Sequence, residues 1–234
     1  MIRIPSGSFW MGSEGRFTWE SPRHRVFTDA FDIAATSVTR HEYETFLKAT
    51  SHEEPKGWRE PDFTAGDQPV VGVNWFDAVA YCEWMSETRG EVFRLPTEAE
   101  WEKACRGGNA EWEYAWGNEP PESIAYFQGE WKAPRVVGTW QANGFGLFNM
   151  GENVHEWCMD WFAADYYALS PEENPAGPLD GTRRVSRGGS WRHQIKGSRI
   201  AHRSSLPPEF RYADYGFRVV REVRQIAGCY PDRT

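Results

Sequence analysis

Five oxygen-bearing side chains lie within twelve residues near the middle of the chain. They are Asn149, Glu152, Asn153, Glu156 and Asp160. Glycines and asparagines in the same stretch allow tight backbone turns. Calcium takes six to eight oxygen ligands, from side chains and carbonyls, on irregular backbone of this kind. The spacing differs from that of an EF-hand loop. The stretch is therefore either a calcium site or a polar turn that leads into an aromatic strand.

Basic side chains gather in a second stretch, residues 187–218. Between its two ends this stretch contains basic and amide side chains at Arg192, His193, Gln194, Lys196, Arg199, His202, Arg203 and Arg211. Such a cluster in an acidic chain suits a carboxylate, a phosphate or an acidic peptide. The alternative is that arginines beside apolar strand residues form internal ion pairs with Glu156, Asp160 or Asp214. Those arginines are Arg187, Arg199, Arg203 and Arg218.

Three histidines occupy the second half of the chain: His155, His193 and His202. A site of three would suit zinc, copper or iron, although their spacing matches no known motif. Ser190 lies in no nucleophile-elbow motif and has no evident base. We therefore treat Ser190, His193 and His155 only as candidate residues of a pocket.

Composition excludes several classes of partner. A net charge of −8 and a pI near 5.4 argue against nucleic acid and anionic membrane surfaces. The chain has no apolar run long enough for a transmembrane helix, and its first residues lack the apolar core of a signal peptide, so we expect a cytoplasmic protein. Four cysteines without CxxC spacing are expected to be free thiols.

Thirteen tryptophans, 22 glycines and 15 prolines predict a core of indole rings held between loops and short strands. This favours an irregular, loop-rich α+β fold over a helical bundle or a doubly wound sheet. No repeat or linker divides the sequence, so we predict a single domain over residues 1–234.

Three helices have clear start signals. Thr39 is the predicted N-cap of a helix that runs to about Ala49, and Asn74 is the predicted N-cap of a second helix that ends near Gly90. Thr97 and Glu100 form a capping box at the start of a third helix, which stops at 107–108. From residue 109 onward no helix longer than two turns is expected. Strands are predicted at 2–11, with a turn at 5–7, at 24–33, and at 187–191 and 216–220.

Eight motifs in a fixed order resemble those of the formylglycine-generating enzyme (sulfatase-modifying factor) family. They include Arg94-Leu-Pro-Thr-Glu-Ala-Glu-Trp101, Asn153-Val-His-Glu-Trp157, Arg187-Gly-Gly-Ser-Trp191 and Gly216-Phe-Arg218. The resemblance covers about residues 2–221. It implies the family's fold, which is loop-rich, α+β and related to C-type lectins.

Active members of that family oxidise a cysteine in a sulfatase peptide, using copper held by two cysteines shortly after the Gly-Gly-Ser motif. Here that place, Trp191 to Arg199, has no cysteine, and His193 stands where the first would be. A soft copper ion needs thiolate ligands of this kind. We therefore do not expect copper or its cysteine-oxidising chemistry.

The resemblance also implies one structural calcium ion. Its ligands would be the side chains of Asn149 and Glu156 and the carbonyls of Glu152 and Val154. Glu152 stands where the family usually has glycine. The family's second calcium site lacks its asparagine, since Ala125 stands there, and is expected to be absent.

Two functions remain open at this stage. The first is a non-copper family member that binds a peptide or protein on its C-terminal loops. The expected contact residues are Trp191, Arg192, His193, Gln194, Lys196, His202, Arg211, Tyr212 and Tyr215. The second is an oxidoreductase whose metal is held by imidazole, with His193, His155 and Ser190 in the same pocket.

Overall fold

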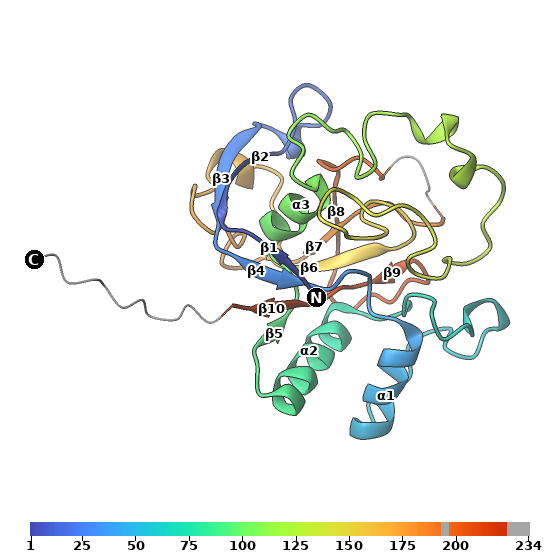
Figure 1. Cartoon of the computed structure of the whole chain (residues 1–234). Coiled ribbons are helices and arrows are strands. Elements are labelled where there is room, and N and C mark those ends of the chain that lie inside the picture. Colours follow the sequence, from blue (N-terminus) through green and yellow to red (C-terminus); the bar gives the residue numbers. More distant parts are fainter. Residues whose placement is uncertain (193–196, 224–234) are drawn as a thin grey trace, which may run out of the picture.

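The structure, a computed structural model, describes residues 1–192 and 197–223. One four-stranded antiparallel sheet contains both the first and the last described strands. It contains β1 (Ile2–Ile4), β4 (Phe31–Ile33), β10 (Val220–Glu222) and β5 (Phe93–Arg94), in that spatial order. Arg3 and Arg221 both pair with Asp32 across it. The first strand, β1, and the last described strand, β10, thus lie on opposite sides of β4 (Figure 1).

Two further sheets build the rest of the β structure. β2 (Gly7–Met11) and β3 (His24–Thr28) form an antiparallel pair. The third sheet has the order β8 (Arg203–Leu206), β7 (Arg184–Arg187), β6 (His155–Trp161) and β9 (Tyr215–Gly216). β6 and β9 are parallel, whereas the other two pairs are antiparallel.

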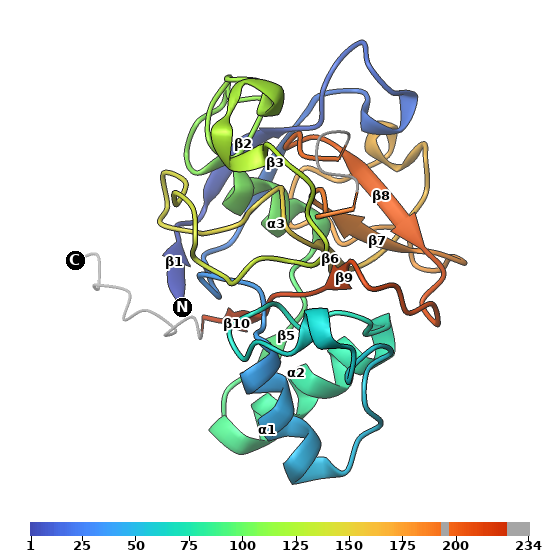
Figure 2. The ribbon, with the colours of Figure 1, turned by 90° about the vertical axis from the view of Figure 1, so that its right-hand side faces the viewer.

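All three predicted helices are confirmed with their caps. They are α1 (Arg40–Thr50), α2 (Trp75–Arg89) and α3 (Glu98–Arg106), and each begins with a capping box at its predicted N-cap. The left-handed residues Gly90 and Gly107 end α2 and α3. α1 and α2 lie together at one end of the molecule, whereas α3 is surrounded by the sheets (Figures 1 and 2).

Only short 3-10 helices accompany them in the described part of the chain. They are η1 (Thr18–Glu20), η2 (Pro61–Phe63), η3 (Pro121–Ser123), η4 (Ala125–Phe127) and η5 (Tyr166–Ala168). The expectation of no long helix after residue 109 is therefore confirmed for the described residues. No described helix is both long and apolar enough to cross a membrane.

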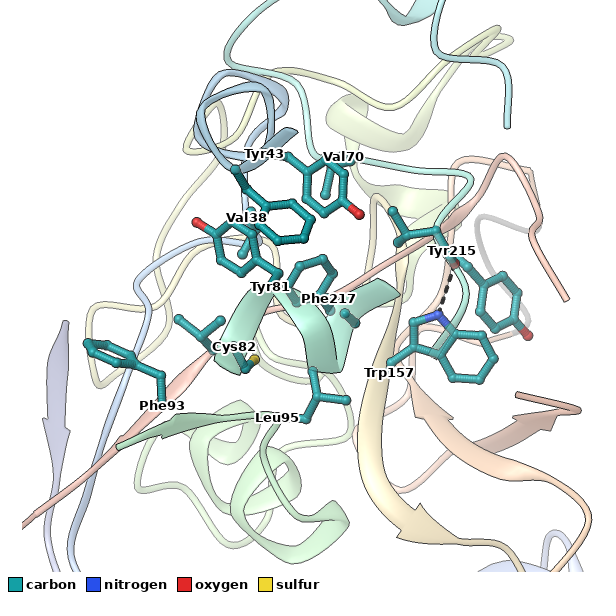
Figure 3. Packing of buried hydrophobic residues seen from close by; sticks show 14 residues of the cluster. Val38, Tyr43, Val70, Tyr81, Cys82, Phe93, Leu95, Trp157, Tyr215 and Phe217 are labelled. Atoms are coloured by element: carbon teal, nitrogen blue, oxygen red, sulfur yellow. Dashed lines mark hydrogen bonds between the residues drawn. The ribbon is translucent and has the colours of Figure 1, made fainter. Parts of the chain in front are cut away.

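Aromatic rings fill the core between α1, α2 and the third sheet. Tyr43 and Tyr81 stack at 5.7 Å, and Phe217 meets both edge-on. Trp157 is fully buried and donates its indole N–H to the carbonyl of Val73 at 3.2 Å (Figure 3). The core is aromatic as predicted, but only Trp101, Trp131 and Trp157 among the tryptophans are buried, so tyrosine, phenylalanine and aliphatic side chains supply most of it. The Trp157 N–H has the partner that burial requires. Cys82, Cys105 and Cys158 are buried free thiols, whereas Cys229 lies outside the described residues.

The two strands predicted in the tail are displaced. β7 ends at Arg187, because Gly188 adopts φ +79° and turns the chain away from the sheet. Residues 217–219 lie between β9 and β10. Two of their carbonyls still form backbone hydrogen bonds: Phe217 accepts from Val38 and Val219 accepts from Ala34. The apolar pattern therefore marked buried backbone correctly but not its strand boundaries.

Candidate functional site

Four arginines of the tail form internal ion pairs, as the alternative interpretation predicted, and we call them struts. Arg187 and Arg203 are almost completely buried and both bind Glu98, at 3.0 and 2.7 Å, while Arg187 also binds Glu102. Glu98 and Glu102 are one turn apart on α3, so this helix face is the anchor of β7 and β8.

The other two struts bind bidentately. Arg199 holds Glu20 at 2.9 and 2.7 Å, and Arg218 holds Glu156 at 2.7 and 2.9 Å. Of the predicted partners, only Glu156 pairs with one of the four. The sequence could not identify the rest, because Glu20, Glu98 and Glu102 are far from the tail along the chain and meet it only through folding.

A cavity of about 420 Å³ opens among the C-terminal loops. Its lining residues are His155, Arg192, Gly197, His202, Ser204, Tyr212, Asp214 and Tyr215. The parallel pairing of β6 with β9 sets His155 opposite Tyr215, and their rings lie 4.9 Å apart. The short strand β9 is therefore what carries residues 212–215 to the end of β6.

His155 has a defined orientation in this pocket. Its Nδ1 lies 2.6 Å from the carbonyl oxygen of Gly188, and a carbonyl can only accept a hydrogen bond. Nδ1 therefore carries the proton in the neutral ring, and Nε2 is the acceptor nitrogen. The side chain is 6% exposed.

Asp214 organises the base of the pocket. It is buried and accepts a hydrogen bond from the Ser190 hydroxyl at 2.9 Å, while its backbone carbonyl accepts from the N–H of His155. Arg192 is half exposed and lies 3.7 Å from the same carboxylate. Ser190 is fully buried and bonded to a carboxylate that holds it in place. This arrangement makes Ser190 a support for the loop rather than an exposed nucleophile.

The predicted contact residues other than Arg211 divide into three groups. Trp191, Arg192, Tyr212 and Tyr215 lie at the pocket or beside it, with Tyr212 41% exposed. His202 also lines the cavity, but its Nδ1 faces Glu20 at 3.5 Å. His193, Gln194 and Lys196 lie outside the described residues.

Arg211 points away from the cavity, contrary to the expected contact role. Its guanidinium binds Asp77 through two bonds of 2.9 Å and Glu53 through a third. Asp77 is buried and also belongs to the capping box of α2, so Arg211 ties loop 207–214 to that helix. Arg211 therefore forms an internal ion pair. Local sequence patterns could not predict this pair, because residues 77 and 211 are 134 positions apart.

Sequence reasoning missed two parts of the site. Ser204 lines the cavity, and nothing in its local sequence distinguishes it from Ser205. The segment around η1 borders the same opening, since Phe17 lies 6.3 Å from the ring of His202. The contact joins residues from opposite ends of the chain, which no local pattern reveals.

The predicted calcium ligands do not fit that ion as the structure arranges them. Both carboxylate oxygens of Glu156 already accept bonds, from Arg218, from the Trp101 indole at 2.7 Å and from Ser37 at 2.7 Å. The amide oxygen of Asn149 accepts from the N–H of Gly138 at 2.9 Å. The guanidinium of Arg218 therefore already neutralises the charge of Glu156, as a bound calcium ion would.

The amide nitrogen of Asn149 donates to the carboxyl of Glu152 at 2.7 Å. Glu152 is buried, and this burial raises its pKa to about 7. The backbone carbonyl of Glu152, a predicted ligand, accepts from the N–H of Val154 at 3.1 Å. Hydrogen bonds therefore use three of the four groups that the calcium prediction assigned to the metal, those of Asn149, Glu152 and Glu156. No group of three or more histidine, cysteine or acidic side chains that could hold a metal occurs among the described residues.

Comparison with known proteins supports the motif assignment. The profile of the sulfatase-modifying factor enzyme 1-like domain matches residues 1–223. A formylglycine-generating enzyme of Streptomyces coelicolor is 34% identical over 97% of this chain and 90% of its own length. A Chlamydia caviae protein named serine/threonine-protein kinase pkn1 is also 34% identical, but this chain spans only 38% of its length. The solved structure of PvdO from Pseudomonas aeruginosa superposes with a TM-score of 0.83 at 29% identity, covering 94% of this chain and 93% of that one.

Calcium is expected to leave thermal stability unchanged. A metal that binds only the folded state at a hundred times its dissociation constant would add about 2.7 kcal/mol. Melting curves with calcium chloride and with EDTA should therefore coincide. A higher melting temperature in calcium that Asn149→Ala abolishes would contradict the assignment of these oxygens to hydrogen bonds.

Glu152 is expected to make stability fall as pH rises. Its pKa is about 7 in the folded chain against an ordinary value of 4.5, so between these pH values the folded state keeps a proton that the unfolded state loses. The free energy of unfolding then decreases by about 3 kcal/mol at most across this window. Urea titrations from pH 4.5 to 8 should show a smaller decrease for Glu152→Gln than for the wild type. Glu122→Gln, at an exposed position, is the matched control, and equal slopes in all three proteins would refute the assignment.

Proposed function

Because this chain belongs to the sulfatase-modifying factor enzyme 1-like family, we propose that its C-terminal pocket binds a peptide or protein ligand. The observation that carries the proposal is the 420 Å³ cavity lined by aromatic, imidazole and guanidinium side chains. Clefts of a few hundred Å³ with a few convergent polar groups are typical binding sites.

Exposed aromatic residues beside the cavity support a macromolecular ligand. Tyr212 and Phe210 are 41% and 43% exposed, and their rings stack at 6.0 Å. Trp191 lies at the opening with its indole N–H bonded to the carbonyl of Ala213 at 3.1 Å, which holds the ring in place. Rigid aromatic side chains of this kind contribute most of the binding energy at protein interfaces.

The cysteines support binding rather than thiolate oxidation. No cysteine occurs between Cys158 and Cys229, and this interval contains all the pocket residues except His155. Burial raises the pKa of the Cys105 and Cys158 thiols. Thiols held neutral in this way are poor metal ligands and poor nucleophiles. The proposal therefore includes no copper-thiolate step.

Selection from a phage-displayed random-peptide library on the immobilised protein tests the proposal. Peptides enriched on the wild type should bind Tyr212→Ala at least about thirtyfold more weakly, as expected for loss of an interface anchor. Arg192→Ala should weaken them less, because this side chain is half exposed and only loosely paired.

Trp10→Ala is the control. Trp10 is 48% exposed on β2 and does not line the cavity, so its loss should leave peptide affinity and melting temperature nearly unchanged. Failure to enrich any peptide, or enriched peptides that bind Tyr212→Ala as well as the wild type, would refute binding at this pocket.

A second candidate is an oxidoreductase that uses an imidazole-held metal. The orientation of His155 favours it, because a metal-ligating histidine usually donates its other N–H to a carbonyl or carboxylate. Here Nδ1 donates its hydrogen to the carbonyl of Gly188. His202 lines the same cavity.

Metal analysis separates the two candidates. Protein purified without chelator should carry no stoichiometric copper, iron or zinc if the pocket only binds peptide. One equivalent of copper or iron that is lost in His155→Ala, with the melting temperature of the variant preserved, would favour the oxidoreductase candidate instead.

A further inference from the structure

Three pairs of aromatic rings surround the opening of the pocket, each from a different part of the chain. Phe17 and Trp19 stack at 4.7 Å with an angle of 15° between planes. Phe210 and Tyr212 stack at 6.0 Å and 13°. Phe63 and Trp191 meet at 6.1 Å. We call these six residues the aromatic rim.

Each pair is connected to the cavity, either by a ring contact with a lining residue or by its position next to one in the chain. Phe17 lies 6.3 Å from His202, a lining residue. Tyr212 itself lines the cavity and lies 6.0 Å from Tyr215. Trp191 directly precedes the lining residue Arg192. The rim is therefore continuous with the pocket, although its members come from loops 13–20, 52–68, 190–192 and 207–212.

The loops that carry the rim are acidic. Loops 13–20, 52–68 and 207–212 contain eight carboxylates against four basic residues. The carboxylates are Glu14, Glu20, Glu53, Glu54, Glu60, Asp62, Asp67 and Glu209, and the basic residues are Arg16, Lys56, Arg59 and Arg211. Negative charges still outnumber positive ones when Arg192 and Lys196 are added to this count of basic residues. Lys196 lies outside the described residues.

Most of the arginines that suggested an acidic ligand are engaged in ion pairs, whereas Arg192 lines the cavity, half exposed, 3.7 Å from the carboxylate of Asp214. Arg199 and Arg211 bind Glu20, Asp77 and Glu53, and the remaining struts are buried. Glu60, Asp62 and Glu209 are exposed on the rim loops. A ligand that approaches the pocket thus meets carboxylates and the electron-rich faces of stacked rings.

We propose that the occupant of this pocket is a basic peptide segment, whose lysine or arginine side chains lie on the aromatic rim. This inference rests on the proposed peptide binding and replaces the acidic ligand that the basic tail suggested. Cations are attracted to the faces of tryptophan, tyrosine and phenylalanine rings, and carboxylates around them steer positive ligands toward the site. Phe210 stacks on Tyr212 through one face and is 43% exposed, so its other face remains for such a contact.

Two synthetic peptides test the charge preference by isothermal titration calorimetry on the full chain. Acetyl-Gly-Arg-Ala-Arg-Gly-amide should bind roughly tenfold more tightly than acetyl-Gly-Glu-Ala-Glu-Gly-amide. Its affinity should fall as sodium chloride is raised, because screening weakens attraction between exposed charges.

Variants locate the effect on the rim. Phe17→Ala and Phe210→Ala, both at exposed positions, should each weaken the basic peptide severalfold, whereas Trp10→Ala should not. Equal binding of both peptides, tighter binding of the acidic peptide, or rim variants that bind like the wild type would overturn this inference.

Library selection distinguishes failure of this inference from failure of the proposed function. Enrichment of peptides rich in lysine or arginine supports both. Enrichment of acidic peptides that require Tyr212 would leave peptide binding intact and refute the basic occupant. If no peptide is enriched and neither synthetic peptide binds, the proposed function itself fails.

Discussion

Buried ion pairs between α3 and the C-terminal strands are the constraint on which the rest of the structure depends. Arg187 and Arg203 are almost completely buried. Arg187 binds both Glu98 and Glu102, and Arg203 binds Glu98. A buried charge without its partner costs about 3–5 kcal/mol. The tail therefore has few alternative positions. Burial favours the neutral acid, but Arg106 and Arg187 hold the pKa of Glu102 below its usual range.

This constraint separates the side chains that support the tail from those that line the cavity, within one short stretch of chain. Inward side chains of β7 and β8 bind α3, while Ser204, Tyr212 and Tyr215 face or border the cavity. Asp77 and Asp214 extend the same principle to the loops, since each is a buried carboxylate that holds side chains of neighbouring segments. A rigid support beneath adaptable loops is the usual arrangement of binding proteins.

The stretch around Glu156 belongs to the support as well. Its carboxylate accepts bonds from Arg218, Trp101 and Ser37, and so connects β6 to α3 and to the segment before α1. The resemblance to a metal-binding family suggested calcium there, because asparagine and glutamate at this spacing suit either a cation or a hydrogen-bond network. Residue types alone do not distinguish these two uses. The positions of the donors do.

Local signals in the sequence determined the helices, the aromatic core and the family. Thr39, Asn74 and Thr97 cap helices whose first turns lie within four residues, so no distant contact was needed to predict them. Tertiary structure alone decided which arginines are struts, that Arg211 turns to Asp77, and that Phe17 reaches the pocket. The physical reason is range: capping bonds join neighbours in sequence, whereas an ion pair or a cavity wall joins residues that only the folded chain brings together.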